Sequence, residues 1–217
     1  MSSTTIKGII FDLDGTLLDT LGDLTTAVNL TCADYGQPIL TRQQVSDNIG
    51  NGFKVTITKS LPGVDASEIP AAVQKFKDHY ASIYMEDSPA YEGVHDLLDE
   101  LKKRQIRLSV VSNKVHGYVV DLIATRFPNH HFDVVYGEGD GQKRKPDPQG
   151  LMEACDAMGL SVEEVLMIGD SEADLLSAQA IGMKMLAVSW GFNSVEKLKS
   201  VGCQSFVFHP KEVLEAL

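Results

Sequence analysis

The chain has 217 residues, of which 43% are apolar and 23% are charged, and it contains no low-complexity tract. This composition is typical of a folded globular protein, and the length suits one compact core with an inserted module. The formal net charge of −11 argues against nucleic acids and anionic membrane surfaces as general partners, because both require a basic surface on the protein.

The cysteines and the first residues bear on localisation. Cys32, Cys155 and Cys203 lack the spacing of a zinc site or a redox pair, so we expect reduced thiols. The first residues are polar and lead into a strand, and no apolar stretch is long enough to cross a membrane. We therefore expect a cytoplasmic protein without a signal peptide. A monomer is the simpler expectation, and a homodimer stays open.

The first predicted element is a buried strand over residues 8–11. It ends in the segment Asp12-Leu13-Asp14-Gly15-Thr16. Ligands of open α/β sheets bind beyond the carboxyl ends of strands, and carboxylates one residue apart point in different directions. One of them could attack as a nucleophile while the other moves protons, if a cation offsets their charge. A solvated turn is the alternative for this segment taken alone.

Residues 17–88 have the hydrophobic period of helices rather than strands. Four helices are expected, with these apolar positions: Leu21, Leu24, Val28 and Leu30; Val45 and Ile49; Phe53, Ile57 and Leu61; Ile69, Val73, Phe76, Tyr80 and Ile83. Thr41 is placed to cap the second of them. The sequence therefore predicts a helical module inserted after the first strand.

From residue 89 onward, helical and strand patterns alternate. Strands are expected at 106–111, 132–136, 165–168, 185–188 and 206–208, with helices at 93–104, 117–126, 148–159, 173–181, near Val195 and at the C-terminus. Such alternation predicts a parallel sheet with helices on both faces.

Polar residues follow several of these strands, as they follow the first. Ser112-Asn113-Lys114 offers a hydroxyl and turn amides to phosphoryl oxygens, although Ser112 is equally suited to cap the next helix. Lys145 precedes two prolines that would fix its direction toward a phosphate, whereas the neighbouring Lys143 and Arg144 are expected to be solvated.

The strand at 165–168 ends in Gly169-Asp170-Ser171, and Asp174 follows one helical turn later. The Asp170 carboxylate would suit a hard cation, while Asp174 would support it or hold Lys145. Helix capping by Asp170 or Ser171 is the alternative. The presence of acids and a lysine at several strand ends together favours the functional interpretation.

These segments resemble the four ordered motifs of the haloacid dehalogenase superfamily of phosphotransferases. The matching positions are Asp12-Leu13-Asp14-Gly15-Thr16, Ser112, Lys145, and Gly169-Asp170-Ser171 with Asp174. The resemblance implies an α/β fold, with a Rossmann-like parallel-sheet core over residues 1–16 and 89–217 and an α-helical cap over 17–88. Asp19 and the segments 49–52 and 145–148 look most like those of phosphoglycolate phosphatases.

The resemblance also implies a role for each matching residue. Asp12 would be the nucleophile, Asp14 the general acid and base, and Ser112, Asn113 and Lys145 the phosphate ligands. Mg²⁺ would be held by Asp12, the Asp14 carbonyl and Asp170, with Thr16 and Asp174 in support. The charges of these residues are consistent with a bound cation, because a phosphate dianion beside three aspartates is repelled unless a divalent cation and a lysine offset them.

In such enzymes the cap would exclude water on closing and would select the substrate. Its candidate contacts are Arg42, Asn51, Gly52 and Lys54. Arg42 also suits a solvated helix position, and the glycine-rich turn at 50–52 also suits an ordinary connection. Trp190 is expected to serve packing.

The expected function is thus a Mg²⁺-dependent phosphatase of a small phosphorylated metabolite, with 2-phosphoglycolate as the first candidate. A phosphosugar mutase resembling β-phosphoglucomutase and a broad-specificity sugar or nucleotide phosphatase are the alternatives, followed by a non-catalytic binding protein. The predicted cap has no obvious sugar-binding cluster of Arg, Lys and Ser, which favours hydrolysis. Two intact aspartates at the first strand argue against a binding-only role.

Overall fold

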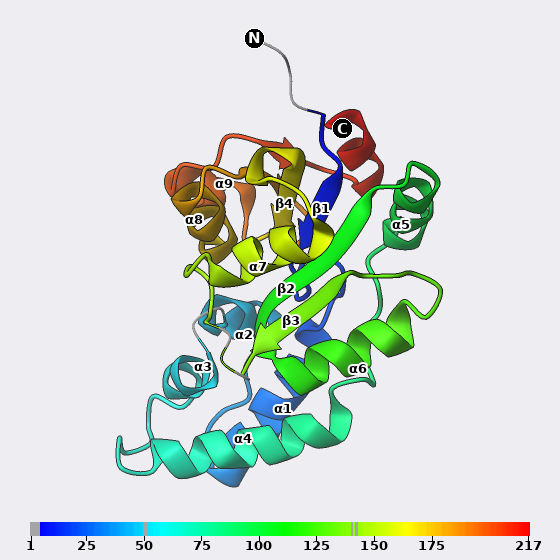
Figure 1. Ribbon diagram of the computed structural model, residues 1–217. Coiled ribbons are helices and arrows are strands. Elements are labelled where there is room, and N and C mark those ends of the chain that lie inside the picture. Colours follow the sequence, from blue (N-terminus) through cyan, green and yellow to red (C-terminus); the bar gives the residue numbers. More distant parts are fainter. Residues whose placement is uncertain (1–4, 50–51, 140, 142) are drawn as a thin grey trace. The chain divides into compact units, whose positions relative to one another are not determined.

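The computed structural model describes residues 5–49, 52–139, 141 and 143–217 (Figure 1). The chain divides into two compact units, one made of Met1–Leu18 with Ala90–Leu217 and the other of Asp19–Pro89. We call them the core unit and the helical unit. The chain leaves the core unit after Leu18 and returns to it at Ala90, and these two residues form an antiparallel bridge.

The core unit is built on a parallel sheet, as the sequence predicts. Its strand order is β3-β2-β1-β4-β5-β6, so β1 lies in the interior of the sheet. Among the described residues the strands are β1 (Gly8–Phe11), β2 (Arg107–Val115), β3 (Val134–Glu138), β4 (Val165–Gly169), β5 (Lys184–Val188) and β6 (Phe206–Val207). All four residues of β1 are buried, which requires cover on both faces of the sheet.

Helices connect the strands of the core unit (Figure 1). They are α5 (Val94–Lys103), α6 (His116–Arg126), α7 (Gln149–Met158), α8 (Glu172–Ala180) and α9 (Val195–Ser200), with 3₁₀ turns at Val162–Glu164 and Pro210–Glu215. Residues of α7 and α8 pack in one hydrophobic cluster with Ile10, Val111 and Met167 of the sheet. The expected C-terminal helix is a 3₁₀ segment instead of an α-helix.

Strand β2 differs most from the sequence prediction. It was expected to end at Val111, but it continues to Val115, with a change of register against β3 between these two residues. Ser112, Asn113 and Lys114 therefore belong to the strand and not to a turn after it. Val115 is the N-cap residue of α6, so the capping alternative for Ser112 is wrong.

The helical unit contains α1 (Leu21–Asp34), α2 (Arg42–Asn48), α3 (Phe53–Ser60) and α4 (Ile69–Ile83), close to the expected positions. Thr41 caps α2 through a reciprocal pair of hydrogen bonds with Gln44. Leu30, expected on the buried face of α1, is 41% exposed. It lies two residues from the buried Val28, and residues two apart point to different sides of a helix.

No helix among the described residues has the length and apolar character needed to cross a membrane.

Candidate active site

The site is built on the carboxyl ends of three adjacent strands. Asp12 directly follows β1, and its backbone N–H donates to the Ile168 carbonyl of β4 at 2.9 Å. Because β1 lies between β2 and β4, Asp12 has Ser112 on one side and Asp170 on the other. All three side chains are buried. The sheet therefore brings together residues that are far apart in the sequence.

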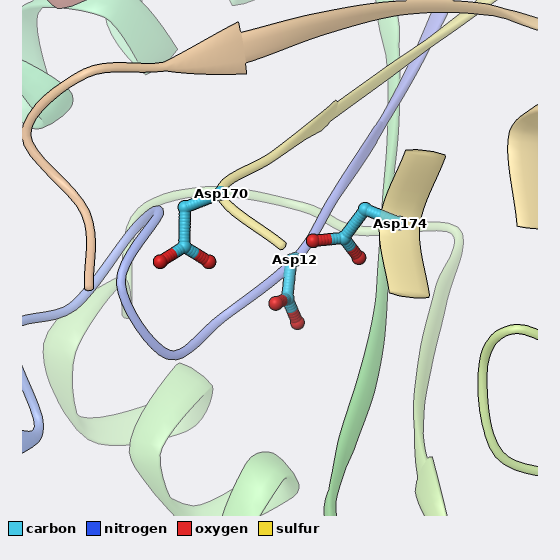
Figure 2. A group of neighbouring side chains, drawn as sticks. All are labelled: Asp12, Asp170 and Asp174. Atoms are coloured by element: carbon cyan, nitrogen blue, oxygen red, sulfur yellow. The ribbon is translucent and has the colours of Figure 1, made fainter. Parts of the chain in front are cut away.

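Three carboxylates form a buried cluster at this edge. Asp12 and Asp170 come from the ends of β1 and β4, and Asp174 comes from the first turn of α8 (Figure 2). One oxygen of each carboxylate lies within 4.8 Å of the others, and the residues are 7%, 2% and 0% exposed. Grouped carboxylate oxygens are the ligands that Mg²⁺ and Ca²⁺ prefer, so the donor set fits a hard divalent cation.

The electrostatics of the cluster point the same way. Burial raises the pKa of Asp12 to about 7, and Asp174 and Asp14 add to this shift while Lys145 opposes it. Burial also raises the pKa of Asp170 well above its ordinary value, and the negative charges of Asp12 and Asp174 act in the same direction. Without a cation, ionised forms of these acids are therefore costly, and a bound cation would favour ionisation.

Lys145 supplies fixed positive charge to the cluster. Its Nζ lies 2.6 Å from Asp174 Oδ1, 3.0 Å from Asp12 Oδ1 and 2.6 Å from the Val111 carbonyl. Burial alone would lower the pKa of Lys145, but Asp12 and Asp174 raise it above its ordinary value. The ammonium group therefore stays charged at neutral pH.

Asn113 holds the backbone of Lys145. Its side-chain Nδ2 donates to the Lys145 carbonyl at 2.9 Å, and its Oδ1 accepts from the Lys145 N–H at 2.7 Å. The Asn113 side chain thus holds the lysine, and the Asn113 amide stays a predicted contact for the phosphate.

Asp174 uses both of its carboxylate oxygens. Oδ1 accepts from Lys145, and Oδ2 accepts from the backbone N–H and the hydroxyl of Ser171 at 3.0 and 2.6 Å. A Cβ on Gly169 would lie 2.4 Å from Asp174 Oδ2, so only glycine fits there. Of the two roles expected for Asp174, these contacts favour holding the lysine over binding a cation.

Lys114 is a residue that the sequence analysis left without a role. Its Nζ lies 2.8 Å from Asp14 Oδ1, and its side chain is only 3% exposed. Ser112 Oγ accepts from the Lys114 backbone N–H at 3.2 Å. A lysine directly after Ser112-Asn113 at a strand end is the sequence signal for this contact, but the turn expected there gives its side chain no partner, whereas β2 does.

The segment after β5 also reaches the site. The backbone N–H of Phe192 donates to Asp170 Oδ2 at 2.6 Å, and Nε1 of Trp190 donates to the Thr16 carbonyl at 3.1 Å. For Trp190, the sequence favours packing over a position at the carboxyl end of the sheet, and this hydrogen bond to the turn after β1 adds to a packing role.

The residues expected to contact the substrate from a cap belong to the helical unit. Arg42 forms an ion pair with Asp19 at 2.5 Å and remains half exposed, and Lys54 is exposed. Gly52 has a φ of 84° and is the N-cap residue of α3. Asn51 lies outside the described residues.

Comparison with known proteins identifies the family. A family model described as haloacid dehalogenase-like hydrolase matches residues 9–188, a span that includes Asp12, Ser112, Lys145, Asp170 and Asp174. The chain belongs to this family of hydrolases.

Relatives of this hydrolase extend over nearly its whole length. A phosphoglycolate phosphatase from Aliivibrio fischeri is 36% identical over 89% of this chain and 88% of its own, and one from Nitrosospira multiformis is 31% identical over 93% and 91%. A solved structure from Lactobacillus delbrueckii subsp. bulgaricus, provisionally named a phosphoglycolate phosphatase, has a TM-score of 0.92 and 31% identity, with 98% of both chains covered. The hydrolase is thus a phosphatase, that is, a phosphoric monoester hydrolase.

Proposed function

We propose that this phosphatase hydrolyses a small phosphate monoester through a phosphorylated Asp12, and that 2-phosphoglycolate is its substrate. The observation that carries the proposal is the position of Asp12, whose buried carboxylate has Lys145 Nζ at 3.0 Å and belongs to the same cluster as Asp170. The Asp12 carboxyl group must be ionised to act as a nucleophile, and a bound phosphate needs positive charge beside it. This arrangement supplies both once a cation is bound.

The carboxylates of Asp12 and Asp170, together with the backbone carbonyl of Asp14, would hold Mg²⁺. When bound, Mg²⁺ supplies positive charge that offsets the substrate phosphate and lowers the pKa of the neighbouring acids. Asp174 is not included, because both of its oxygens already accept hydrogen bonds from Lys145 and Ser171.

In the first step, a carboxylate oxygen of Asp12 attacks phosphorus, and the bond from phosphorus to the leaving oxygen breaks. Asp14 donates a proton to that oxygen. In the second step, Asp14 takes a proton from water as the water attacks the phosphorus of phospho-Asp12, which releases phosphate and restores Asp12. Lys145 and Ser112 would hold the phosphoryl oxygens, and Lys114 would orient the Asp14 carboxylate.

The substrate is inferred from the relatives, several of which are named phosphoglycolate phosphatase. We propose that the helical unit, residues 19–89, is the cap that selects this substrate. Its candidate contacts are Asn51, Gly52, Lys54 and Arg42, of which we expect Arg42 to contribute least because it pairs with Asp19. The three cysteines are free thiols, which agrees with the cytoplasmic location that we propose.

Phosphate release from a panel of monoesters tests the proposal. The panel contains 2-phosphoglycolate, hexose phosphates, nucleotides and p-nitrophenyl phosphate, each with Mg²⁺ and with EDTA. We expect the highest kcat/KM for 2-phosphoglycolate and no turnover with EDTA. Broad, weak release would refute the substrate, and a product that retains the phosphoryl group on a sugar would indicate a mutase.

The mechanism has its own test. Asp12→Asn should abolish turnover and leave the fold intact, and wild-type enzyme quenched during turnover should carry one hydroxylamine-labile phosphate that Asp12→Asn lacks. A variant with normal turnover would refute covalent catalysis by Asp12.

A further inference from the structure

The segment that follows β5 connects two turns that the proposed mechanism uses. Trp190 Nε1 donates to the carbonyl of Thr16, two residues after Asp14, at 3.1 Å. The backbone N–H of Phe192 donates to Asp170 Oδ2 at 2.6 Å. Three consecutive residues therefore contact both the turn that carries Asp14 and the carboxylate of Asp170.

Gly191, between these two donors, is packed against the same groups. A Cβ at this position would lie 2.3 Å from Asp170 Cβ, 2.5 Å from Asp170 Oδ2 and 2.5 Å from the Gly15 carbonyl. No side chain fits in that space without moving one of the two turns. The absence of a side chain at position 191 is thus what lets the segment reach both groups at once.

The contact between Trp190 and the turn uses the backbone carbonyl of Thr16 and not its side chain. Thr16 is 1% exposed, and its Oγ1 has no hydrogen-bond partner among the described residues. Backbone hydrogen bonds from Thr16 and Leu17 to Leu13 close the turn internally. The indole of Trp190, in contrast, ties the turn to the segment that holds Asp170.

We infer that residues 190–192 are a positioning segment for the reaction, in which Trp190 fixes the Asp14 turn relative to Asp170 and the Phe192 N–H fixes the rotation of the Asp170 carboxylate. None of the four motifs recognised in the sequence includes these residues. The inference rests on the proposed roles of Asp14 and Asp170, because only those roles make their relative position matter for turnover.

Trp190→Phe keeps an aromatic ring and removes the indole N–H. We expect kcat to fall by about 5- to 50-fold with KM changed less than about threefold, because small displacements of reacting groups act on the chemical step. The dissociation constant of Mn²⁺, measured calorimetrically on enzyme without substrate, should rise by at least about threefold. p-Nitrophenyl phosphate is the substrate, so the result does not depend on 2-phosphoglycolate.

Arg104→Met is the matched control, because Arg104 Nη1 donates to the Leu214 carbonyl at 3.0 Å, and Arg104 precedes the first residue of β2 rather than following a carboxyl end. Both variants lose one side-chain hydrogen bond to a distant carbonyl. We expect similar small decreases in melting temperature, with kcat and the Mn²⁺ dissociation constant unchanged in Arg104→Met. A Trp190→Phe variant that matches this control in kcat and in Mn²⁺ binding would overturn the inference.

A second variant guards against a packing effect of the smaller ring. The chain contains one tryptophan, so a tryptophan auxotroph fed benzothienylalanine replaces the indole N–H by sulfur at position 190 alone. This protein should show the same loss of kcat as Trp190→Phe; full activity would assign the loss to packing. Asp170→Asn with unaltered turnover and Mn²⁺ binding would instead refute the proposed function, which separates the two failures.

Discussion

The ammonium group of Lys114 lies 2.8 Å from Oδ1 of Asp14, and so joins the end of β2 to the turn after β1. The Lys114 side chain is almost completely buried, whereas that of Asp14 is 21% exposed. A buried lysine thus holds, by one oxygen, the carboxylate to which we assign proton transfer. The position of Asp14 depends on a strand that enters the sheet much later in the sequence.

Removal of this ammonium group should impair proton transfer selectively. Lys114→Met preserves the length of the side chain but removes its ion pair with Asp14 Oδ1. We expect kcat to fall by about 10- to 100-fold for alkyl phosphates and much less for p-nitrophenyl phosphate, whose leaving group needs no proton. Lys143→Met is the control, because Lys143 is exposed and forms an ion pair with Asp147, four residues away. Equal losses for both leaving groups would contradict this role.

The raised pKa of Asp12 predicts how the stability of the metal-free enzyme depends on pH. Burial raises this pKa from 3.8 to about 7, so the folded state keeps a proton that the unfolded state has lost between these values. The stabilisation is complete below about pH 4 and disappears as pH rises through 7. Over this range the free energy of unfolding should fall by about 1–3 kcal/mol more in wild type than in Asp12→Asn, measured by urea unfolding in EDTA.

Asp147 provides a control, because its pKa is shifted in the opposite direction from that of Asp12. The backbone N–H of Gln149 and the side chain of Lys143 lower the pKa of Asp147, so its contribution is present at neutral pH and is lost as pH falls through the lowered value. Asp147→Asn should therefore change the acid side of the stability curve only. Parallel curves for wild type and Asp12→Asn between pH 4 and 7 would show that Asp12 has an ordinary pKa.

Alanine substitutions at two glycines distinguish the effect of backbone strain from the effect of crowding in the site. Gly15 has a φ of 80°, and a Cβ there would lie 2.4 Å from Asp170 Oδ2; Gly36 has a φ of 61° and open space around it. Each substitution by alanine should cost about 1 kcal/mol of stability for the positive φ. Gly15→Ala should also lose most activity, since Asp170 must move, whereas Gly36→Ala should keep it. Comparable kcat values for the two variants would refute the crowding argument.

The contribution of Arg42 can be decided by one substitution. Arg42 pairs with Asp19 at 2.5 Å, and the two side chains are 48% and 29% exposed, so the pair should contribute less than about 1 kcal/mol to stability. Because Asp19 already occupies its guanidinium, we expect Arg42→Gln to retain kcat/KM for 2-phosphoglycolate within about twofold. A tenfold or larger rise in KM, restored by Arg42→Lys, would make Arg42 a substrate ligand.

Residues that interrupt a hydrophobic pattern were predictable from the sequence. Asp12 and Asp170 each break off an apolar run that forms a buried strand, and parallel strands bring such ends to one edge. The strand and helix positions followed from the two hydrophobic periods in the same way. The cluster at the sheet edge could therefore be anticipated, although its distances and the shared contacts of Lys145 could not.

Two kinds of contact could not be predicted from the sequence, although the residues that make them are visible in it. The irregularity between Val111 and Val115 lengthens β2 and carries Lys114 to Asp14, and no residue pattern marks it. The Trp190 indole donates to a backbone carbonyl, and the donor of Phe192 is its backbone N–H. Nearly every residue has these backbone groups, so the sequence does not mark such contacts. Such contacts depend on how loops that are distant in sequence come together, which local periodicity does not encode.

The bridge between Leu18 and Ala90 joins the two points where the chain leaves and re-enters the core unit. Asp19 and Pro89, the ends of the helical unit, are also joined, by a hydrogen bond of 2.9 Å. The inserted segment is therefore a loop whose two ends are held together. The entropy of closing a loop grows only slowly with its length. Because we propose that the helical unit selects the substrate, replacing the segment between these two fixed ends should change specificity while Asp12 and Asp14 keep their places in the core unit.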